Sequence, residues 1–246
     1  MIKALTLAAS LAFLASAALA EPTRAMVRAQ AHDAKFIGDH MGGVQVTLVD
    51  ARTGVVLAKG LTKGGAGDTP LIMKTPRTRG MSIADPSSAG FEAVLDLKQP
   101  TFGRVEAVGP VGKPAAAIKV SSTQWILPGR DIIGDGWVLD FPGLVIEPMA
   151  TVTPGGALQI SAKVSLMCGC PIEPDGIWNV DTYKVEAQLM QGDQQVAKAA
   201  LAYAGQPSQF TGAVAKQASG RYRLRLVAFD TTSSNAGVVE IPLHLR

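Results

Sequence analysis

The stretch GRYRLRLVAFD, at residues 220–230, decides the fold because its apolar and basic side chains alternate. Four apolar residues fall on one face and three arginines on the other: Tyr222, Leu224, Leu226 and Ala228 against Arg221, Arg223 and Arg225. A repeat of two residues is the period of a β-strand that is buried on one side only. The stretch therefore predicts a strand that lies on a hydrophobic core.

The rest of the second half shows the same period in several short segments. Alternating or apolar runs occupy residues 158–168, 183–189, 196–203, 210–214 and 238–245. Turn residues such as Gln191-Gly192-Asp193 and Asn235-Ala236-Gly237 separate some of them. Short strands at this spacing are typical of an antiparallel β-sandwich.

Three parts of this half carry a resemblance to a known class of module: Ser219–Leu224, Val227–Asp230 and the turn Asn235–Gly237. They resemble the last two strands of bacterial immunoglobulin-like and fibronectin type III-like modules, and the resemblance covers residues 145–246. Such modules often carry a tyrosine near the start of this strand, whose hydroxyl returns to the backbone. Tyr222 is the matching position. The chain lacks the paired inter-sheet cysteines of antibody domains, and the fold so implied hosts many functions.

The first half predicts a second all-β domain. Val44–Val49 alternates, Asp50–Gly54 turns the chain and Val55–Ala58 returns, which indicates a hairpin. Further extended segments are expected at residues 91–97, 104–108, 118–122, 124–127 and 137–141. The opening strands and the Thr53-Gly54 turn resemble the prealbumin-like modules of exported bacterial proteins. We therefore expect an all-β protein with two β-sandwich domains in tandem, at residues 43–143 and 144–246, the second immunoglobulin-like.

The amino terminus has the three parts of a secretory signal peptide. Lys3 supplies a positive charge, Leu5–Ala17 is mostly apolar, and Ala18-Leu19-Ala20 is a small-residue cleavage site. We expect residues 1–20 to be removed and the mature chain to be periplasmic or secreted. Residues 21–42 have weak periodicity and are interpreted as a loosely docked arm. No later segment is long and apolar enough for a transmembrane helix.

Composition excludes some classes of protein. The chain has 246 residues and a formal charge of +3, which falls to +2 when the signal peptide and its single lysine are removed. Nucleic-acid binding usually shows as a marked basic stripe, so no nucleic-acid partner is expected. Hydrophobic residues make up 47% of the chain, which suits a folded protein and not a disordered one.

The two cysteines of the chain, Cys168 and Cys170, are separated only by Gly169. On an ideal strand their Cα atoms would lie about 6.5–7 Å apart, near the upper limit for a relaxed disulfide. Glycine permits the kink that would bring the sulfur atoms together. Three interpretations stay open: a local disulfide, structural or redox-active; a soft-metal site; or a pair that only continues the apolar face and closes a loop. An oxidising compartment favours the disulfide.

A soft-metal site would use both thiolates and would suit copper or zinc; no other cofactor is predicted. Met167 is one candidate third ligand, although strict alternation points it away from the cysteines unless the strand bends. The other candidates are His32, His40 and Met41, in or beside the arm. The sequence does not show whether the arm reaches the pair.

No catalytic motif is recognised, and with three histidines in the chain we expect a protein that is not an enzyme. Lys74, Arg77 and Arg79 form a basic cluster that would suit an acidic partner or a solvated loop. The expected function is that of an exported binding or accessory module that contacts a protein or a cell-envelope component. The alternative is a periplasmic soft-metal (copper) binding or redox protein that acts through Cys168 and Cys170.

Overall fold

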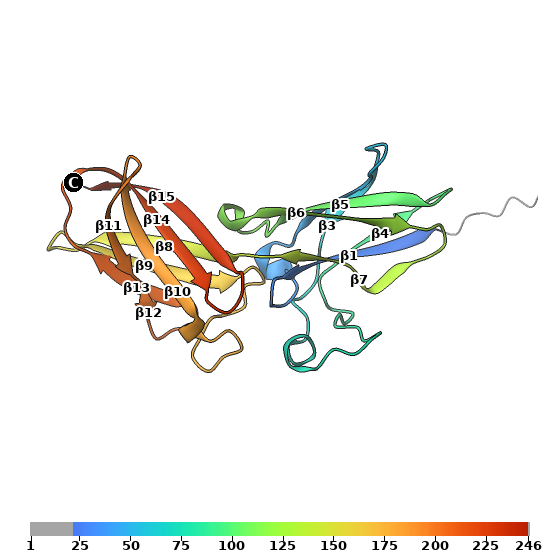
Figure 1. The fold of residues 1–246 in the computed structure, drawn as a ribbon, viewed down its shortest axis with the longest axis horizontal. Coiled ribbons are helices and arrows are strands. Elements are labelled where there is room, and N and C mark those ends of the chain that lie inside the picture. Colours follow the sequence, from blue (N-terminus) through green and yellow to red (C-terminus); the bar gives the residue numbers. More distant parts are fainter. Residues whose placement is uncertain (1–21, 246) are drawn as a thin grey trace, which may run out of the picture.

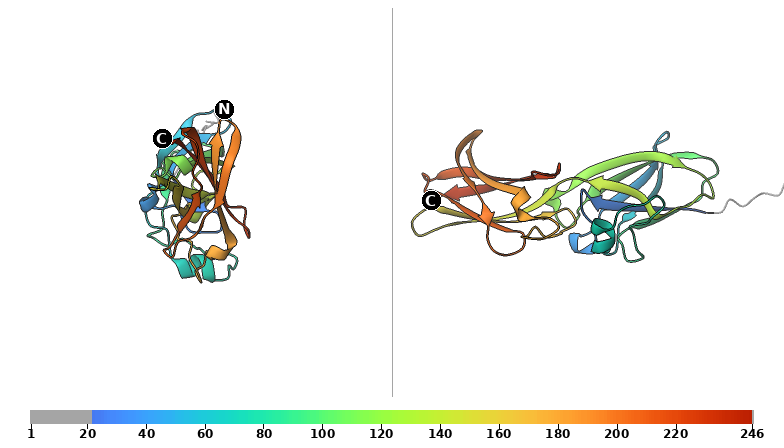
Figure 2. Two further views of the ribbon diagram at one scale, coloured as in Figure 1. Left: turned by 90° about the vertical axis from the view of Figure 1, so that its left-hand side faces the viewer. Right: turned by 60° about the horizontal axis from the view of Figure 1, so that its bottom comes forward.

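The structure, a computed structural model, describes residues 22–245 and consists of two lobes placed end to end (Figures 1 and 2). Strands β1–β7 build the N-terminal lobe and β8–β15 build the C-terminal lobe. The chain passes from one to the other at Pro142-Gly143. The expected signal peptide, residues 1–20, lies outside the described residues. The predicted all-β fold of two sandwiches in tandem is confirmed.

The N-terminal lobe is a sandwich of two sheets with the strand orders β4-β1-β7 and β3-β2-β5-β6. Its strands are β1 (Thr23–Ala31), β2 (Gln45–Asp50), β3 (Val56–Leu61), β4 (Phe91–Leu95), β5 (Thr101–Gly109), β6 (Ile118–Ile126) and β7 (Ile132–Phe141). Three short helical segments accompany them: η1 (Asp39–Met41), η2 (Pro70–Lys74) and η3 (Pro114–Ala116). The expected hairpin is formed by β2 and β3, and Asp50 closes its turn by accepting hydrogen bonds from two backbone N–H groups.

The expected arm at residues 21–42 is wrong, because much of it is a central strand. β1 pairs antiparallel with β4 and parallel with β7, and most of its residues are buried. The inward positions of β1 are mostly alanine and valine, and alanine has a weak preference for strands, so the alternation was easy to miss. Arg28 fixes the segment further: its guanidinium donates to the carbonyl oxygens of Ser88 and Ala89, and burial lowers its pKa.

The C-terminal lobe is an immunoglobulin-like sandwich of two antiparallel sheets, β11-β10-β14-β15 and β12-β13-β9-β8. Its strands are β8 (Leu144–Val152), β9 (Leu158–Leu166), β10 (Tyr183–Gln191), β11 (Gln194–Ala200), β12 (Ala202–Tyr203), β13 (Gln209–Val214), β14 (Gly220–Asp230) and β15 (Ala236–Leu245), with η4 (Val180–Thr182) before β10. Buried hydrophobic side chains of both lobes form one continuous cluster. The two sandwiches therefore share a core at their junction.

Strand β14 behaves as the sequence predicts. Tyr222, Leu224, Leu226 and Ala228 are buried, with exposed fractions of at most 6%. The Tyr222 hydroxyl donates a hydrogen bond of 2.9 Å to the carbonyl oxygen of Ala218, so the expected return of this side chain to the backbone is confirmed.

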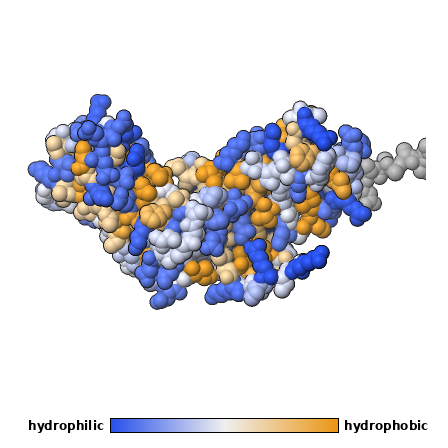
Figure 3. All heavy atoms as spheres, viewed as in Figure 1, coloured by the Kyte–Doolittle hydropathy of each residue, from blue (hydrophilic) through white to orange (hydrophobic). Residues whose placement is uncertain are grey.

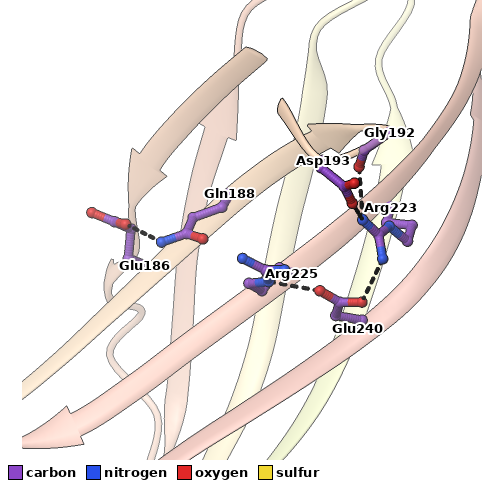
Figure 4. A network of polar contacts seen from close by, with 7 residues as sticks. All are labelled: Glu186, Gln188, Gly192, Asp193, Arg223, Arg225 and Glu240. Carbon is purple, nitrogen blue, oxygen red and sulfur yellow. Dashed lines mark hydrogen bonds and ion pairs between the residues drawn. The ribbon is translucent and has the colours of Figure 1, made fainter. Parts of the chain in front are cut away.

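The outer face of the same sheet is polar, as Figure 4 shows. Glu240 on β15 accepts a hydrogen bond of 2.6 Å from Arg225 Nε and pairs with Arg223 Nη1 at 3.4 Å. Arg223 also donates to the carbonyl oxygen of Gly192 at the β10–β11 turn. Pairs at such a surface add little stability each, but they keep this face hydrated and turn the apolar face of β14 inward. Among residues 22–245, no helix combines the length and apolar character needed to cross a bilayer.

Candidate functional site

The two cysteines lie in the tight turn that follows β9, and their Sγ atoms are joined in a disulfide. We had expected the β9 alternation to continue to Cys168, but the strand ends at Leu166. The turn begins there because the Gly169 N–H donates to the Leu166 carbonyl at 2.8 Å. Gly169 has a φ of +73°, a conformation that glycine adopts at little cost. The kink expected of this glycine brings the two Cα atoms to 5.3 Å.

The N-terminal lobe reaches this turn through η1. His40 Nε2 donates a hydrogen bond of 2.7 Å to the carbonyl oxygen of Cys168, which fixes the proton on that ring nitrogen because a carbonyl only accepts. A Cβ atom added to Gly169 would lie 2.7 Å from both His40 Nε2 and Met41 Sδ. Both side chains therefore pack directly against the glycine between the cysteines, and no larger residue fits there without displacing them.

A cavity of about 330 Å³ opens beside the disulfide, between the two lobes. One wall comes from the N-terminal lobe and includes Lys35 and His40, and the other includes the disulfide turn, Glu173 and Trp178. Lys35 Nζ donates to the Thr69 hydroxyl at 2.9 Å, so the ammonium group is held at the wall. The cavity therefore presents an ammonium, a carboxylate, an imidazole and an indole around a disulfide.

Hydrogen bonds across the junction hold these walls together. The Trp178 indole N–H donates to the Asp33 carbonyl at 3.0 Å. The buried amide of Asn235 donates to the His32 carbonyl and accepts from the Gly143 N–H, both at 2.9 Å. Asn235 was assigned from sequence only to a turn. The signal that could have found it is weak, since a buried polar side chain with partners in the other lobe and in the interlobe connection is recognised only from the fold.

The β14–β15 turn that carries Asn235 is ordered by Asp230. Its carboxylate accepts hydrogen bonds from the Thr232 N–H and hydroxyl and from the Ser233 hydroxyl. Burial acts to raise the pKa of Asp230, but these hydrogen bonds outweigh it and the pKa lies below its ordinary value. Nearby, burial and the carboxylates of Asp230 and Asp33 raise the pKa of Tyr183, so its phenol stays neutral.

The structure separates the candidate metal ligands into two groups. Cys168, Cys170 and His40 line the cavity, and the buried Met41 contacts Gly169 between the two cysteines. His32 does not, because its Nδ1 pairs with Asp140 Oδ2 at 2.8 Å on another side of the junction.

Met167 is buried and packs toward Gly143. Within residues 22–245, in this disulfide form, no three His, Cys, Asp or Glu side chains are arranged to hold a metal ion.

The basic cluster lies apart from the cysteines. Lys74 ends η2, and Arg77 and Arg79 follow in an exposed segment. Arg77 lines a separate cavity of about 370 Å³ together with Asp33 and Asp140. Its role as a partner surface stays a prediction.

A further hollow at the junction, of about 350 Å³, is lined largely by apolar residues: Pro114, Ala115 and Ala116 of η3, and Val145, Val239 and Ile241 from β8 and β15. On the face drawn in Figure 3, hydrophobic residues gather around the waist between the lobes. The junction is thus apolar on this side and mixed in character at the disulfide.

The fold and the junction define a two-domain protein of the immunoglobulin-like β-sandwich class. No family model and no curated protein sequence matches the chain. Among solved structures it is similar to the chicken interferon gamma receptor alpha chain, with 7% identity and a TM-score of 0.35 over 93% of this chain and 99% of that one. It is also similar to beta-glucuronidase 3 of Bacteroides uniformis, with 12% identity and a TM-score of 0.21 over 92% of this chain and 25% of that one. Both TM-scores are below 0.5, so neither similarity carries an argument.

Proposed function

We propose that this protein is an exported, non-enzymatic binding or accessory protein that contacts a protein or cell-envelope component. The observation that carries the proposal is the cavity between the lobes, whose walls come from both domains and hold a few polar groups on a partly apolar surface. Binding sites of this kind are common at domain junctions, and a volume of 300–1,000 Å³ is usual for them. The cavity is at the lower end, which suits a small ligand or one or two side chains of a partner.

The junction also supports a preformed site. Its walls are tied together by the hydrogen bonds of Trp178, Asn235 and His40 and by the shared hydrophobic core. A site that is already ordered loses less conformational freedom when it binds, so more of the contact energy remains as affinity.

Export is part of the proposal. The signal-like residues 1–20 support it, and so does a disulfide that would persist in an oxidising compartment. Cell fractionation with amino-terminal sequencing tests it: we expect a periplasmic or secreted chain that begins at Glu21. A chain recovered from the cytoplasm with its leader intact would rule export out.

Partner capture from envelope extract tests the binding function. Ala66→Trp places a large side chain in the cavity wall. The matched control is Ala213→Trp, at an exposed position near the far end of β13. We expect a partner that wild type and Ala213→Trp retain and Ala66→Trp loses. If both tryptophan variants retain the same partners as wild type, the cavity is not the binding site.

A second candidate function is supported by a specific observation. His40 bonds the Cys168 carbonyl and Met41 contacts Gly169, and thiol, thioether and imidazole are groups that soft metals or redox reactions use. In this candidate the protein handles copper, or zinc, or electrons through Cys168 and Cys170. The bacterial origin and the prealbumin-like character of the first lobe remain expectations from sequence.

A further inference from the structure

The turn that holds the disulfide has a third sulfur atom beside it. Met41 is only 4% exposed, and its Sδ lies against Gly169, which is the residue between the two cysteines in the sequence. Cys168 and Cys170 are bonded to each other, so neither is a thiolate and neither can bind a metal in this state. Reduction would release two thiols, one on each side in the chain of the glycine that the Met41 thioether contacts from the other lobe.

We propose that the reduced protein binds Cu(I) through the Cys168 and Cys170 thiolates and the Met41 thioether. Cu(I) is a soft ion that favours thiolate and thioether sulfur, and three sulfur donors suit it. The proposal deepens the second candidate function and makes the disulfide a switch that closes the site when it forms. The site is shared between the lobes, because η1 supplies the thioether and the turn after β9 supplies the thiolates.

Opening the site needs a reductant, which we assign to the class of dithiols. Its thiolate attacks Sγ of Cys170, the more accessible of the pair at 5% exposed against 0% for Cys168. The Cys168 thiolate leaves, and the second thiol of the reductant then displaces Cys170. The pair gains two electrons and two protons, and the reductant becomes a disulfide. Cu(I) then replaces both thiol protons.

Charges around the cavity bear on the bound form. Two thiolates and one Cu(I) carry a net charge of −1. Lys35 lies in the same cavity wall and its ammonium group would offset this charge, while the Glu173 carboxylate on the opposite wall would oppose it. Lys35→Met is therefore expected to weaken Cu(I) binding, and Glu173→Gln to strengthen it.

His40 is assigned as a positioning residue and not as a ligand. Its Nε2 is already used to hold the Cys168 carbonyl, at 2.7 Å. A glutamine can place an amide N–H near the same point. His40→Gln should therefore retain Cu(I) affinity that His40→Ala loses, and an equal loss in both variants would contradict the positioning role.

The test uses the mature chain reduced with a phosphine under argon and titrated with Cu(I) against bathocuproine disulfonate. We expect one Cu(I) per reduced chain and none in the disulfide form. Cys168→Ser should abolish binding. Met41→Leu keeps the size of the side chain and removes its sulfur, so affinity should fall at least tenfold. The matched control is Met167→Leu, which removes a neighbouring sulfur that packs toward Gly143 and should change nothing.

X-ray absorption at the copper edge gives a second readout, with three sulfur neighbours expected in wild type and two in Met41→Leu. Equal affinities for Met41→Leu and Met167→Leu would overturn the proposal, as would tight binding of Zn(II) by a reduced chain that does not bind Cu(I). The partner capture described above uses the disulfide form. If partner capture succeeds and Cu(I) binding is absent, the metal function fails. If Cu(I) binds and no partner is captured, the binding function fails.

Discussion

Replacing Gly169 with alanine tests whether the two lobes really meet at the cysteine turn. The φ of +73° costs a residue with a Cβ atom about 1–2 kcal/mol. The new Cβ would also lie 2.7 Å from His40 Nε2 and Met41 Sδ, which is too close for both. Moving these two side chains weakens the hydrogen bond from His40 to Cys168, at a cost of about 1 kcal/mol, and strains the packing at a cost of about 1–3 kcal/mol. The whole cost is about 3–6 kcal/mol.

Gly205→Ala is the matched control for this change. Gly205 lies in the same lobe with a φ of +80°, and a Cβ added there meets nothing within 4 Å. It carries the backbone cost alone, about 1–2 kcal/mol. The loss of unfolded-state entropy that alanine brings is common to both variants and cancels between them. The difference between the variants, about 2–4 kcal/mol, therefore reports the close approach of the N-terminal lobe.

Thermal and urea unfolding of the two variants measure this difference. For a chain of this size about 1 kcal/mol corresponds to a Tm shift of about 2–4 °C, so Gly169→Ala should melt about 4–16 °C below Gly205→Ala. Equal melting temperatures would show that nothing crowds Gly169, and the contact of η1 with the disulfide turn would have to be given up.

Three further predictions concern the junction and the second sandwich. Asn235→Ala removes two part-buried hydrogen bonds, one to His32 of the N-terminal lobe and one to Gly143 of the connection. It should lower the unfolding free energy by about 2–4 kcal/mol and broaden the spread of lobe orientations in small-angle scattering, and an unchanged Tm would mean that the bonds are not made. Tyr222→Phe removes the hydrogen bond from the hydroxyl to Ala218 and should lower the unfolding free energy, measured with urea, by about 1 kcal/mol. An unchanged free energy would show that this bond does not stabilise the fold. Asp230→Asn should be less stable than wild type at pH 7. Because the folded-state pKa of Asp230 is lowered, this advantage of wild type is present above the unfolded-state pKa of about 3.9 and is lost as the pH falls further. A difference in Tm between wild type and Asp230→Asn that stays constant from pH 7 to pH 2.5 would contradict the lowered pKa of Asp230.

Sequence periodicity predicted the strands that have one solvent-exposed face and one buried face. β14 is the clearest case, because arginines at every second position leave no doubt about which side is buried. β2 and β10 follow for the same reason. β1 was missed because it lies in the middle of a sheet and is buried at most positions, so that its polar residues, including Arg28, do not mark an outer face. From the sequence alone, an arginine is expected at the surface, although Arg28 lies inside and donates to backbone oxygens.

The candidate site could be predicted only in part. The cysteine pair and the need for a kink at Gly169 follow from local spacing and from the properties of glycine. The approach of His40 does not, since it depends on how two domains pack, and a separation of 128 positions between His40 and Cys168 leaves no local signal. Met167 was named as a ligand because it is adjacent in sequence. In the structure the Met167 side chain packs against Gly143, whereas the sulfur atom of Met41, far away in the chain, contacts Gly169 between the cysteines.

The position of β1 also explains why the site is built at the junction. β1 ends at Ala31, and the next ten residues supply the Asp33 and His32 carbonyls that bind the other lobe and then η1, which meets the disulfide turn. One segment therefore links the core of the first sandwich to the contacts with the second. Because β1 is held by two neighbouring strands, His40 and Met41 are placed by the core of the N-terminal sandwich and not by a loose arm. A cavity between domains keeps its shape only if both walls are anchored in this way, and here each wall is continuous with a strand of its own sandwich.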